Sequence, residues 1–328
     1  MADLRYGGYG GYGGYGGYGG YGGYGNSGGS GGGMFVDRVD LPLVSDPCID
    51  PVSAHPEKVP PVRFKAKGFG ANLWSTRWYS WVLMSDLASK ADWLSRLGGY
   101  GLLDPWPATG EKLEKDIKEL RRMAIEERAD ALGEIVSEAD EFISKFLHLV
   151  SATAVTHPAT ARMLIVADAL TALIAMHYKV HFNRPRPTQV APGLLTPIQH
   201  GGHASYPSGH STQAHVFAKL LTEVIPRELG VPAPTPSDPT RTTIGKSLGV
   251  LADRIARNRE IAGLHYPSDT EAGVKLAGAI STKILLDRAS PAYLPRFRAL
   301  VEDAKAEWAK SGVFIDEDGS VITPTGAA

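Results

Sequence analysis

The chain contains a single cysteine, Cys48, among its 328 residues. One cysteine excludes an intrachain disulfide, so nothing in the sequence requires an oxidising compartment. A block of positive charge is also missing, since the formal net charge is -1 and acidic and basic residues are interspersed. This pattern argues against a nucleic-acid partner and against binding to an anionic membrane surface.

Signals for export and for membrane insertion are scarce as well. No N-terminal stretch has the charged and then apolar form of a signal peptide. The longest apolar stretch, around Met163–Met176, contains Asp168 and falls short of the ~20 residues that a span requires. We therefore expect a soluble, cytoplasmic protein with no membrane span, and a homo-oligomer stays open.

The first 33 residues contain almost no aliphatic side chains. Tyrosines recur with a period of three from Tyr6 to Tyr24, separated by Gly-Gly, and a Gly/Ser run follows to Gly33. Such a low-complexity segment cannot bury a core, so residues 1–33 are expected to form a disordered leader. The sequence leaves open whether this leader is a flexible linker or a self-associating, tyrosine-rich tail.

Helical periodicity, by contrast, is abundant. Leu113, Ile117 and Leu120 form one apolar stripe, and a second stripe follows Gly133. A helix that is apolar nearly all round is predicted at residues 159–182, and further helices near residues 211–225, 244–259, 268–288 and 296–310. No alternating β pattern of any length is present, so the predicted fold class is all-α, a helical bundle.

The composition divides the chain after the leader into three parts. Residues 34–110 combine a proline-rich arm with aromatic residues at 73–97, which we interpret as one or two buried helices packed on the body. Residues 111–290 form the predicted helical core, which carries motifs at 179–187, 207–210 and 259–269. Residues 291–328 are expected to form a C-terminal helix and a tail.

The first two motifs supply cations and a helix N-terminus. Lys179 lies near the end of the apolar helix and Arg186 just after it, in the pattern K-x6-RP. The second motif, Pro207-Ser208-Gly209-His210, opens a helix. There, free backbone N–H groups and the positive end of the helix favour an anion.

The third motif has the pattern R-x5-H-x3-D and contains Arg259, His265 and Asp269. Together the three motifs offer three cations, a helix N-terminus, two histidines and a carboxylate. Phosphoryl transfer without a metal needs such groups. Cations and N–H groups neutralise the equatorial oxygens, while a nucleophile and an acid flank the phosphorus in line.

In these motifs and their order, residues 160–290 resemble the superfamily of type 2 phosphatidic acid phosphatases, bacterial class A acid phosphatases and vanadium haloperoxidases. The resemblance implies a helical bundle of the acid phosphatase and vanadium haloperoxidase type. It also implies an oxyanion site, for phosphate or vanadate, made by Lys179, Arg186, Ser208, Gly209, His210 and Arg259.

The resemblance further assigns the catalytic roles. It implies that His265 is the nucleophile that becomes phosphohistidine, or the protein ligand to vanadium if vanadate is bound. It implies that His210 protonates the leaving group and that Asp269 bonds to the far nitrogen of His265. Asn258 departs from the pattern, because many phosphatases have serine there. This difference leaves the predicted oxyanion contacts intact and puts in doubt only a contact to the residues that support them.

Other histidines surround these motifs. His177 and His181 are four residues apart, a spacing that can bind zinc, but no third ligand accompanies them and no metal site is predicted. His200, His203 and His215 lie around the Ser-Gly-His turn and are candidates for lining the pocket.

Two enzymatic functions compete. The first is a soluble phosphatase that hydrolyses small phosphomonoesters and needs no cofactor. The second is a vanadium-dependent haloperoxidase of bromoperoxidase type, with vanadate as cofactor and hydrogen peroxide and a halide as substrates.

His203 resembles the bromoperoxidase pattern His-x-Ser-Tyr-Pro-Ser-Gly-His, in which it would tune the halide step. Met176 stands where haloperoxidases tend to carry tryptophan, and Pro-Ser after Tyr266 resembles the phosphatases, so we favour the phosphatase. A membrane-embedded lipid phosphatase is not expected, because the helices that carry the motifs are too short or too charged to span. A helical scaffold with a dead pocket would require a missing catalytic residue, and none is missing.

Overall fold

The computed structural model describes residues 69–106, 110–226 and 244–310, and the backbone of two short strands. Cys48, the leader, most of the proline-rich arm, the segment 227–243 and most of the C-terminal tail lie outside these residues. The elements in chain order are η2 (Ala71–Leu73), α4 (Thr76–Ala88), α5 (Trp93–Leu97), η3 (Tyr100–Leu102), α6 (Glu111–Glu126), α7 (Arg128–Ser137), α8 (Ile143–Leu149), α9 (Pro158–Phe182), α10 (Pro187–Val190), η4 (Pro192–Leu194), α11 (Gly209–Val224), α12 (Ile244–Ile261), α13 (Pro267–Ile280), η6 (Ser281–Leu285), α14 (Pro295–Lys310), β1 (Phe314–Ile315) and β2 (Val321–Ile322). Apart from these two strands, the regular structure described is helical, which confirms the predicted all-α class.

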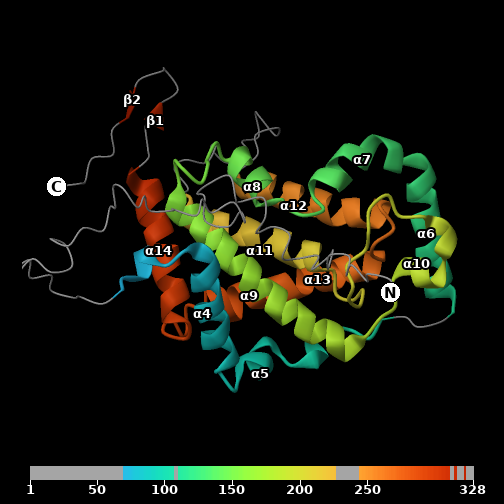
Figure 1. The fold of residues 1–328 in the computed structure, drawn as a ribbon, viewed down its shortest axis with the longest axis horizontal. Coiled ribbons are helices and arrows are strands. Elements are labelled where there is room, and N and C mark those ends of the chain that lie inside the picture. Colours follow the sequence, from blue (N-terminus) through green and yellow to red (C-terminus); the bar gives the residue numbers. More distant parts are fainter. Residues whose placement is uncertain (1–68, 107–109, 227–243, 311–313, 316–320, 323–328) are drawn as a thin grey trace, which may run out of the picture.

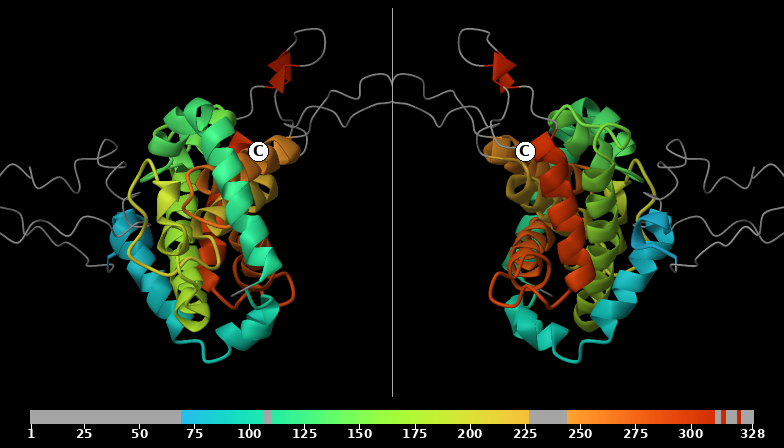
Figure 2. Two further views of the ribbon diagram at one scale, coloured as in Figure 1. Left: turned by 90° about the vertical axis from the view of Figure 1, so that its right-hand side faces the viewer. Right: turned by 90° about the vertical axis from the view of Figure 1, so that its left-hand side faces the viewer.

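Helix α9 is central because it is apolar on almost every face. It begins at Pro158, whose missing N–H would have no partner in the first turn, and it ends at Asn183, which has a φ of 45°. Helices α4, α11 and α14 pack against it (Figures 1 and 2). The predicted helix therefore forms, and its apolar circumference is explained by neighbours on several sides.

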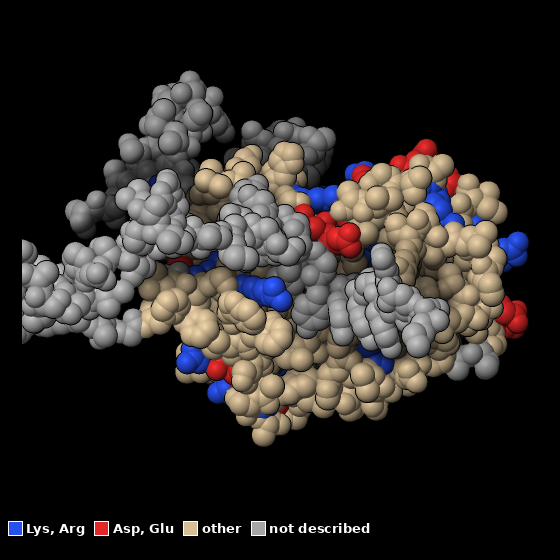
Figure 3. Space-filling model, in the orientation of Figure 1, with Lys and Arg blue, Asp and Glu red and all other residues tan. Residues whose placement is uncertain are grey.

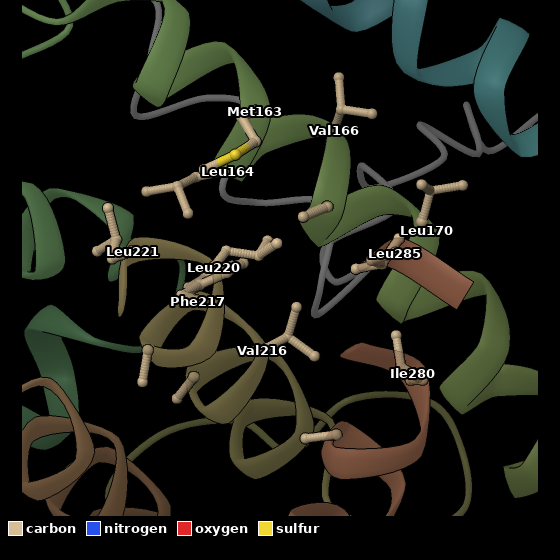
Figure 4. Packing of buried hydrophobic residues seen from close by; sticks show 14 of the residues in the cluster. Met163, Leu164, Val166, Leu170, Val216, Phe217, Leu220, Leu221, Ile280 and Leu285 are labelled. Carbon is tan, nitrogen blue, oxygen red and sulfur yellow. The ribbon is translucent and has the colours of Figure 1, made fainter. Parts of the chain in front are cut away.

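Helix α11 is the second axis of the bundle, since it contacts α9, α12 and α13. Figure 4 shows side chains from α9, from α11 and from α13 with η6 meeting between these elements. Leu170, Phe217 and Ile280 are fully buried there. Each fully buried large apolar side chain contributes about 1.5–3 kcal/mol to folding. This packing fixes the N-terminus of α11, which carries the Ser-Gly-His motif.

Helices α11 and α13 approach each other most closely at Gly273. A β-carbon at this position would lie 2.8 Å from Cβ of Ser211 and 2.9 Å from the carbonyl oxygen of Ser208. The backbone N–H of Ser208 donates to the carbonyl oxygen of Asp269 at 2.9 Å. The first turns of the two helices are thereby held against each other.

One detail of the predicted helices is wrong. The region 73–97 does form helices, and Gly98, with a φ of 109°, ends α5 as a C-cap. However, Trp74, Trp78 and Trp81 of this region are exposed rather than buried, at 38%, 52% and 55%. Gly133 lies inside α7, and the chain turns at Glu127 between α6 and α7.

The expectation that no segment is long and apolar enough for a membrane span also needs correction. The segment Pro158–Val190, which contains α9, passes a test of length and composition, with a mean hydropathy of 1.7. Within the protein, 72% of its most apolar window is buried. A buried core helix of a helical bundle passes the same test, so this segment alone does not decide the relation to a membrane.

Charged side chains are mixed by sign on the described surface. Figure 3 shows Lys and Arg beside Asp and Glu on one face, among a larger area of other residues. This face carries no block of positive charge among the residues described, as the sequence predicts.

Candidate active site

The three motifs meet at one cavity of about 430 Å³. The loop after α9 brings Arg186, the first turn of α11 brings Gly209 and His210, and the end of α12 with the following turn brings Arg259 and His265. The apolar part of the wall consists of Ala172, Ala175 and Met176 from α9, Val136 and Ala139 from the region of α7, and Ile198 and Leu264 from loops.

His265 is held from both sides of its ring. Its Nδ1 lies 3.0 Å from Oδ2 of Asp269, and its Nε2 lies 3.1 Å from Nη1 of Arg186. Because a carboxylate accepts the hydrogen on Nδ1, the lone pair of the neutral ring is on Nε2. Burial and the charge of Arg186 hold the pKa of His265 well below that of an ordinary histidine. The ring is therefore neutral, and its Nε2 faces the guanidinium of Arg186.

Asp269 is completely buried and is held by several donors. It accepts from Oγ of Ser205, from the backbone N–H of Tyr266 at 3.2 Å and from Nη1 of Arg184 at 2.7 Å. Burial alone would raise its pKa, but the hydrogen bond to His265 and the charge of Arg184 outweigh it and lower the pKa to about 2. Asp269 is thus ionised at any physiological pH and fixes the tautomer of His265.

Arg186 connects the histidines at the floor of the cavity. Besides His265, its guanidinium lies 3.0 Å from Nδ1 of His203 and donates to the carbonyl oxygen of Leu264 at 3.0 Å. Burial lowers its pKa to about 10, so it still carries its charge at neutral pH. A buried cation on the wall of a cavity is a strong site for an anion.

Arg259 has donors that no described residue uses. Its Nη2 donates to the carbonyl oxygen of Ile135 at 2.9 Å and to Oε2 of Glu138 at 3.1 Å. Its Nε and Nη1 are buried and have no partner within the described part of the chain. An unpaired buried donor is costly, and Arg259 lines the cavity. A bound oxyanion would satisfy both atoms.

Lys179 and Ser208 lie behind the cavity wall rather than among the residues that line it. Nζ of Lys179 donates to the carbonyl oxygens of Ala204 and Ser205 at 2.9 and 2.8 Å. Burial and the nearby charge of Arg186 hold its pKa well below the ordinary value. Ser208 is the N-cap of α11, and its Oγ accepts from the N–H of Ser211 at 3.3 Å. In this structure both residues support the loop and the helix start, and their contact with an oxyanion stays a prediction.

His210 lines the cavity from the first turn of α11. Its Nε2 lies 3.1 Å from the carbonyl oxygen of Glu138, and its ring stacks on Phe142 with centroids 5.2 Å apart. A carbonyl only accepts, so Nε2 carries a hydrogen and Nδ1 is left for the cavity. Burial and the charge of Arg259 lower the pKa of His210 to about 3 in the empty cavity. A dianionic ligand would offset those cations and raise that pKa.

The three candidate pocket histidines have different positions. His200 and His203 line the cavity. His215 does not, because its ring bonds to the carbonyl oxygen of Ser211 at 2.7 Å and lies 3.0 Å from Oδ1 of Asp253 on α12. The prediction for His215 is therefore wrong, since the helical turn directs it to the neighbouring helix.

His177 and His181, the pair with a zinc-binding spacing, both contact the ring of Tyr100. Nε2 of His177 lies 2.7 Å from the hydroxyl of Tyr100, and His181 stacks on the same ring at 3.5 Å. Among the described residues there is no group of three or more histidine, cysteine or carboxylate side chains that could hold a metal ion.

Two functional partners were missed in the sequence. Arg184 bonds to Asp269 and stacks on Tyr266, 3.6 Å from the ring centroid. Arg184 lies between Lys179 and Arg186 in the first motif, and this position could have indicated a place near the site. Glu138 bonds to Arg259, to Asn258 at 3.0 Å and to Lys145 at 2.7 Å, but it is far away in sequence and has no local pattern. Asn258 and Arg259 both donate to Glu138, so Asn258 helps to hold the carboxylate that positions Arg259.

Comparison with known proteins agrees with the motifs. Residues 160–289 match the model of the PAP2 superfamily, which confirms the predicted resemblance over the segment that carries all three. Among solved structures, the chain is similar to "Crystal structure of the first transmembrane PAP2 type phosphatidylglycerolphosphate phosphatase from Bacillus subtilis". That similarity has 16% sequence identity and a TM-score of 0.28, and it covers 63% of this chain and 90% of that chain. No curated protein matches the chain.

Proposed function

We propose that the chain is a phosphatase that hydrolyses phosphomonoesters through a phosphohistidine on His265, because residues 160–289 match the model of the PAP2 superfamily. The observation that supports this most is the cavity floor. His265, whose Nε2 lies 3.1 Å from Nη1 of Arg186, lines the same cavity as Arg259, whose Nε and Nη1 have no partner among the described residues. A phosphoryl group between them would meet a nucleophile and two donors.

In the first step, Nε2 of His265 attacks the phosphorus and the P–O bond to the leaving group breaks. Arg186 and Arg259 neutralise the equatorial oxygens, and the N–H of Gly209 adds a donor at the helix N-terminus. Nδ1 of His210 takes the proton that a monoanionic substrate brings and delivers it to the leaving oxygen. Asp269 stabilises the ring of His265 as it gains positive charge.

In the second step, water attacks the phosphohistidine and the P–N bond breaks. His210 now accepts a proton from the water, and Nε2 of His265 regains its lone pair. No metal or other cofactor is needed in this proposal, and a small phosphorylated molecule is its substrate.

A vanadium-dependent haloperoxidase is the alternative, favoured by His203 beside Arg186 on the cavity wall. Vanadate is also a tetrahedral oxyanion, so the free donors of Arg259 and the lone pair of His265 fit it as they fit phosphate. When bound, it would supply the activation of hydrogen peroxide. Met176 lines the cavity at the position where haloperoxidases tend to carry tryptophan, which favours the phosphatase.

We also propose that the enzyme is soluble and cytoplasmic. Helix α9 is packed between α4, α11 and α14, and it carries Asp168 and Lys179, both buried within the protein. Exposing it to lipid would require these contacts to open. Sedimentation of the expressed protein with or without detergent checks this part, and recovery only in the membrane fraction would contradict it.

The central test compares two activities on one preparation. Hydrolysis of p-nitrophenyl phosphate is measured beside bromination of a dye with added vanadate, hydrogen peroxide and bromide. We expect phosphate release without any metal, and inhibition of that release by orthovanadate. Faster bromination than release of phosphate from any ester would overturn the proposal in favour of the haloperoxidase.

A further inference from the structure

Gln213 is a polar side chain on the cavity wall that the mechanism above does not use. It lies one turn after Gly209 on α11 and is 5% exposed. Its Nε2 donates to Oδ1 of Asp168 on α9 at 2.7 Å. Its Oε1 accepts no hydrogen bond from any residue that the structure describes.

The bond to Asp168 sets which end of the amide faces the cavity while that carboxyl is ionised, and burial raises its pKa to about 7. Asp168 is buried on α9, and its carboxyl oxygen Oδ1 accepts the N–H of Gln213. The carbonyl end of the amide must then point the other way. It lies over the start of the helix, since a β-carbon on Gly209 would be 3.8 Å from Oε1. Gln213 thus presents a neutral acceptor beside the first turn of α11, in a cavity that Asp140 and Gln199 also line.

The carbonyl oxygen of Gln213 repels the oxygens of a phosphate group. It can bond only to a group that donates a hydrogen, such as a hydroxyl or a water molecule. The attacking water has two hydrogens. His210 takes one of them through Nδ1, which has no partner in the described part of the chain. The second hydrogen needs an acceptor, and the neighbouring wall from α9, Ala172 and Ala175, offers none.

We propose that Oε1 of Gln213 holds the second hydrogen of the attacking water and so makes the pocket select water over alcohols as phosphoryl acceptor. In this step the water oxygen bonds to phosphorus and the P–N bond to His265 breaks. One proton goes to His210, and the other stays on the product phosphate as a hydroxyl bonded to Gln213. An alcohol has one O–H, which His210 takes, so it gains nothing from Gln213. Asp168 is a positioning residue for this selection.

The inference rests on the proposed phosphatase and is tested by partitioning. The full-length enzyme hydrolyses p-nitrophenyl phosphate with increasing 1-butanol, and the released p-nitrophenol and inorganic phosphate are both counted. In Gln213→Met the water step loses one hydrogen bond, so the share of phosphoryl groups transferred to butanol should rise about 5- to 20-fold. Phosphohistidine, trapped with labelled substrate, should accumulate in the same variant.

Variants of Asp168 separate orientation from simple packing. Asp168→Asn keeps an acceptor for Nε2 of Gln213 and should retain the wild-type partition. Asp168→Leu releases the amide and should shift the partition toward butanol. The double variant Gln213→Met with Asp168→Leu replaces the pair by apolar groups, which keeps the test valid if a single variant fails to fold. His215→Ala, on the same helix but outside the cavity, is the matched control.

The outcomes distinguish the two proposals. An unchanged partition in folded Gln213→Met, or a raised KM with the same partition, would overturn the role of Gln213 and leave the phosphatase intact. Absence of both p-nitrophenol release and labelled protein in the wild type would overturn the phosphatase itself.

Discussion

The surroundings of the two active-site histidines differ in how fully they are bonded. His265 contacts Asp269 through one nitrogen and Arg186 through the other, and it is 4% exposed. His210 contacts one carbonyl oxygen through Nε2 and has no described partner on Nδ1. A nucleophile must keep one orientation and one tautomer, whereas a group that gives and takes a proton needs an open nitrogen. The difference in bonding therefore matches the proposed division of roles.

The largest effect on activity is expected when His265 is replaced. His265→Ala should remove turnover of every phosphomonoester, because the proposed mechanism then has no nucleophile to form the phosphoenzyme. Circular dichroism should show the same helical content as the wild type. Retention of more than a few per cent of the activity would show that the phosphohistidine assignment is wrong.

His210→Ala should have a large effect that depends on the leaving group. Alkyl phosphates need a proton on the leaving oxygen, so their turnover should fall about 10²–10⁴-fold, the usual range for general acid catalysis. p-Nitrophenolate leaves without protonation, so the loss on its ester should be clearly smaller. His203→Ala should leave both rates nearly unchanged. An equal loss on both esters would assign His210 to binding rather than to proton transfer.

Arg259→Ala should lower activity less than His265→Ala or His210→Ala does. Removing one oxyanion donor costs on the order of 2–4 kcal/mol of transition-state stabilisation. Steady-state kinetics should show this as a fall in kcat/KM of about 30- to 1,000-fold, together with weaker inhibition by phosphate and orthovanadate. Unaltered affinity for both anions would contradict the assignment of the free Nε and Nη1.

The smallest effect concerns pH. The pKa of His210 is about 3 in the free enzyme, so the ring is neutral from about pH 4 upward and the substrate must bring the proton as a monoanion. Phosphate monoesters have a second pKa near 6, so kcat/KM should fall about tenfold per pH unit above that value. The inflection should move with the pKa of the ester when two esters are compared. A fixed inflection for both would indicate an enzyme group instead.

Much of the site could be predicted because each motif is local. Spacing within K-x6-RP or R-x5-H-x3-D is fixed by one helix end and its turn, so residue types at those positions indicate their chemistry. Partners from distant segments could not be predicted. Glu138 reaches Arg259 across 121 positions in the sequence, and Gln213 depends on Asp168 across 45. The exposure of Trp74, Trp78 and Trp81 was missed for the same reason, because burial depends on which helices cover α4.

Gly273 carries no chemistry, yet the spacing of the reacting groups depends on it. The turn with Ser208 and Gly209 belongs to α11, and His265 and Asp269 precede or open α13, so the two halves of the site meet where these helices touch. A single methyl group at position 273 would collide with Ser208 and Ser211 and would push the first turn of α11 away from His265. Reactions of this kind tolerate little misplacement of the reacting atoms. The distance between the two helices thus restricts position 273 to glycine, although glycine has no side chain that could take part in the reaction.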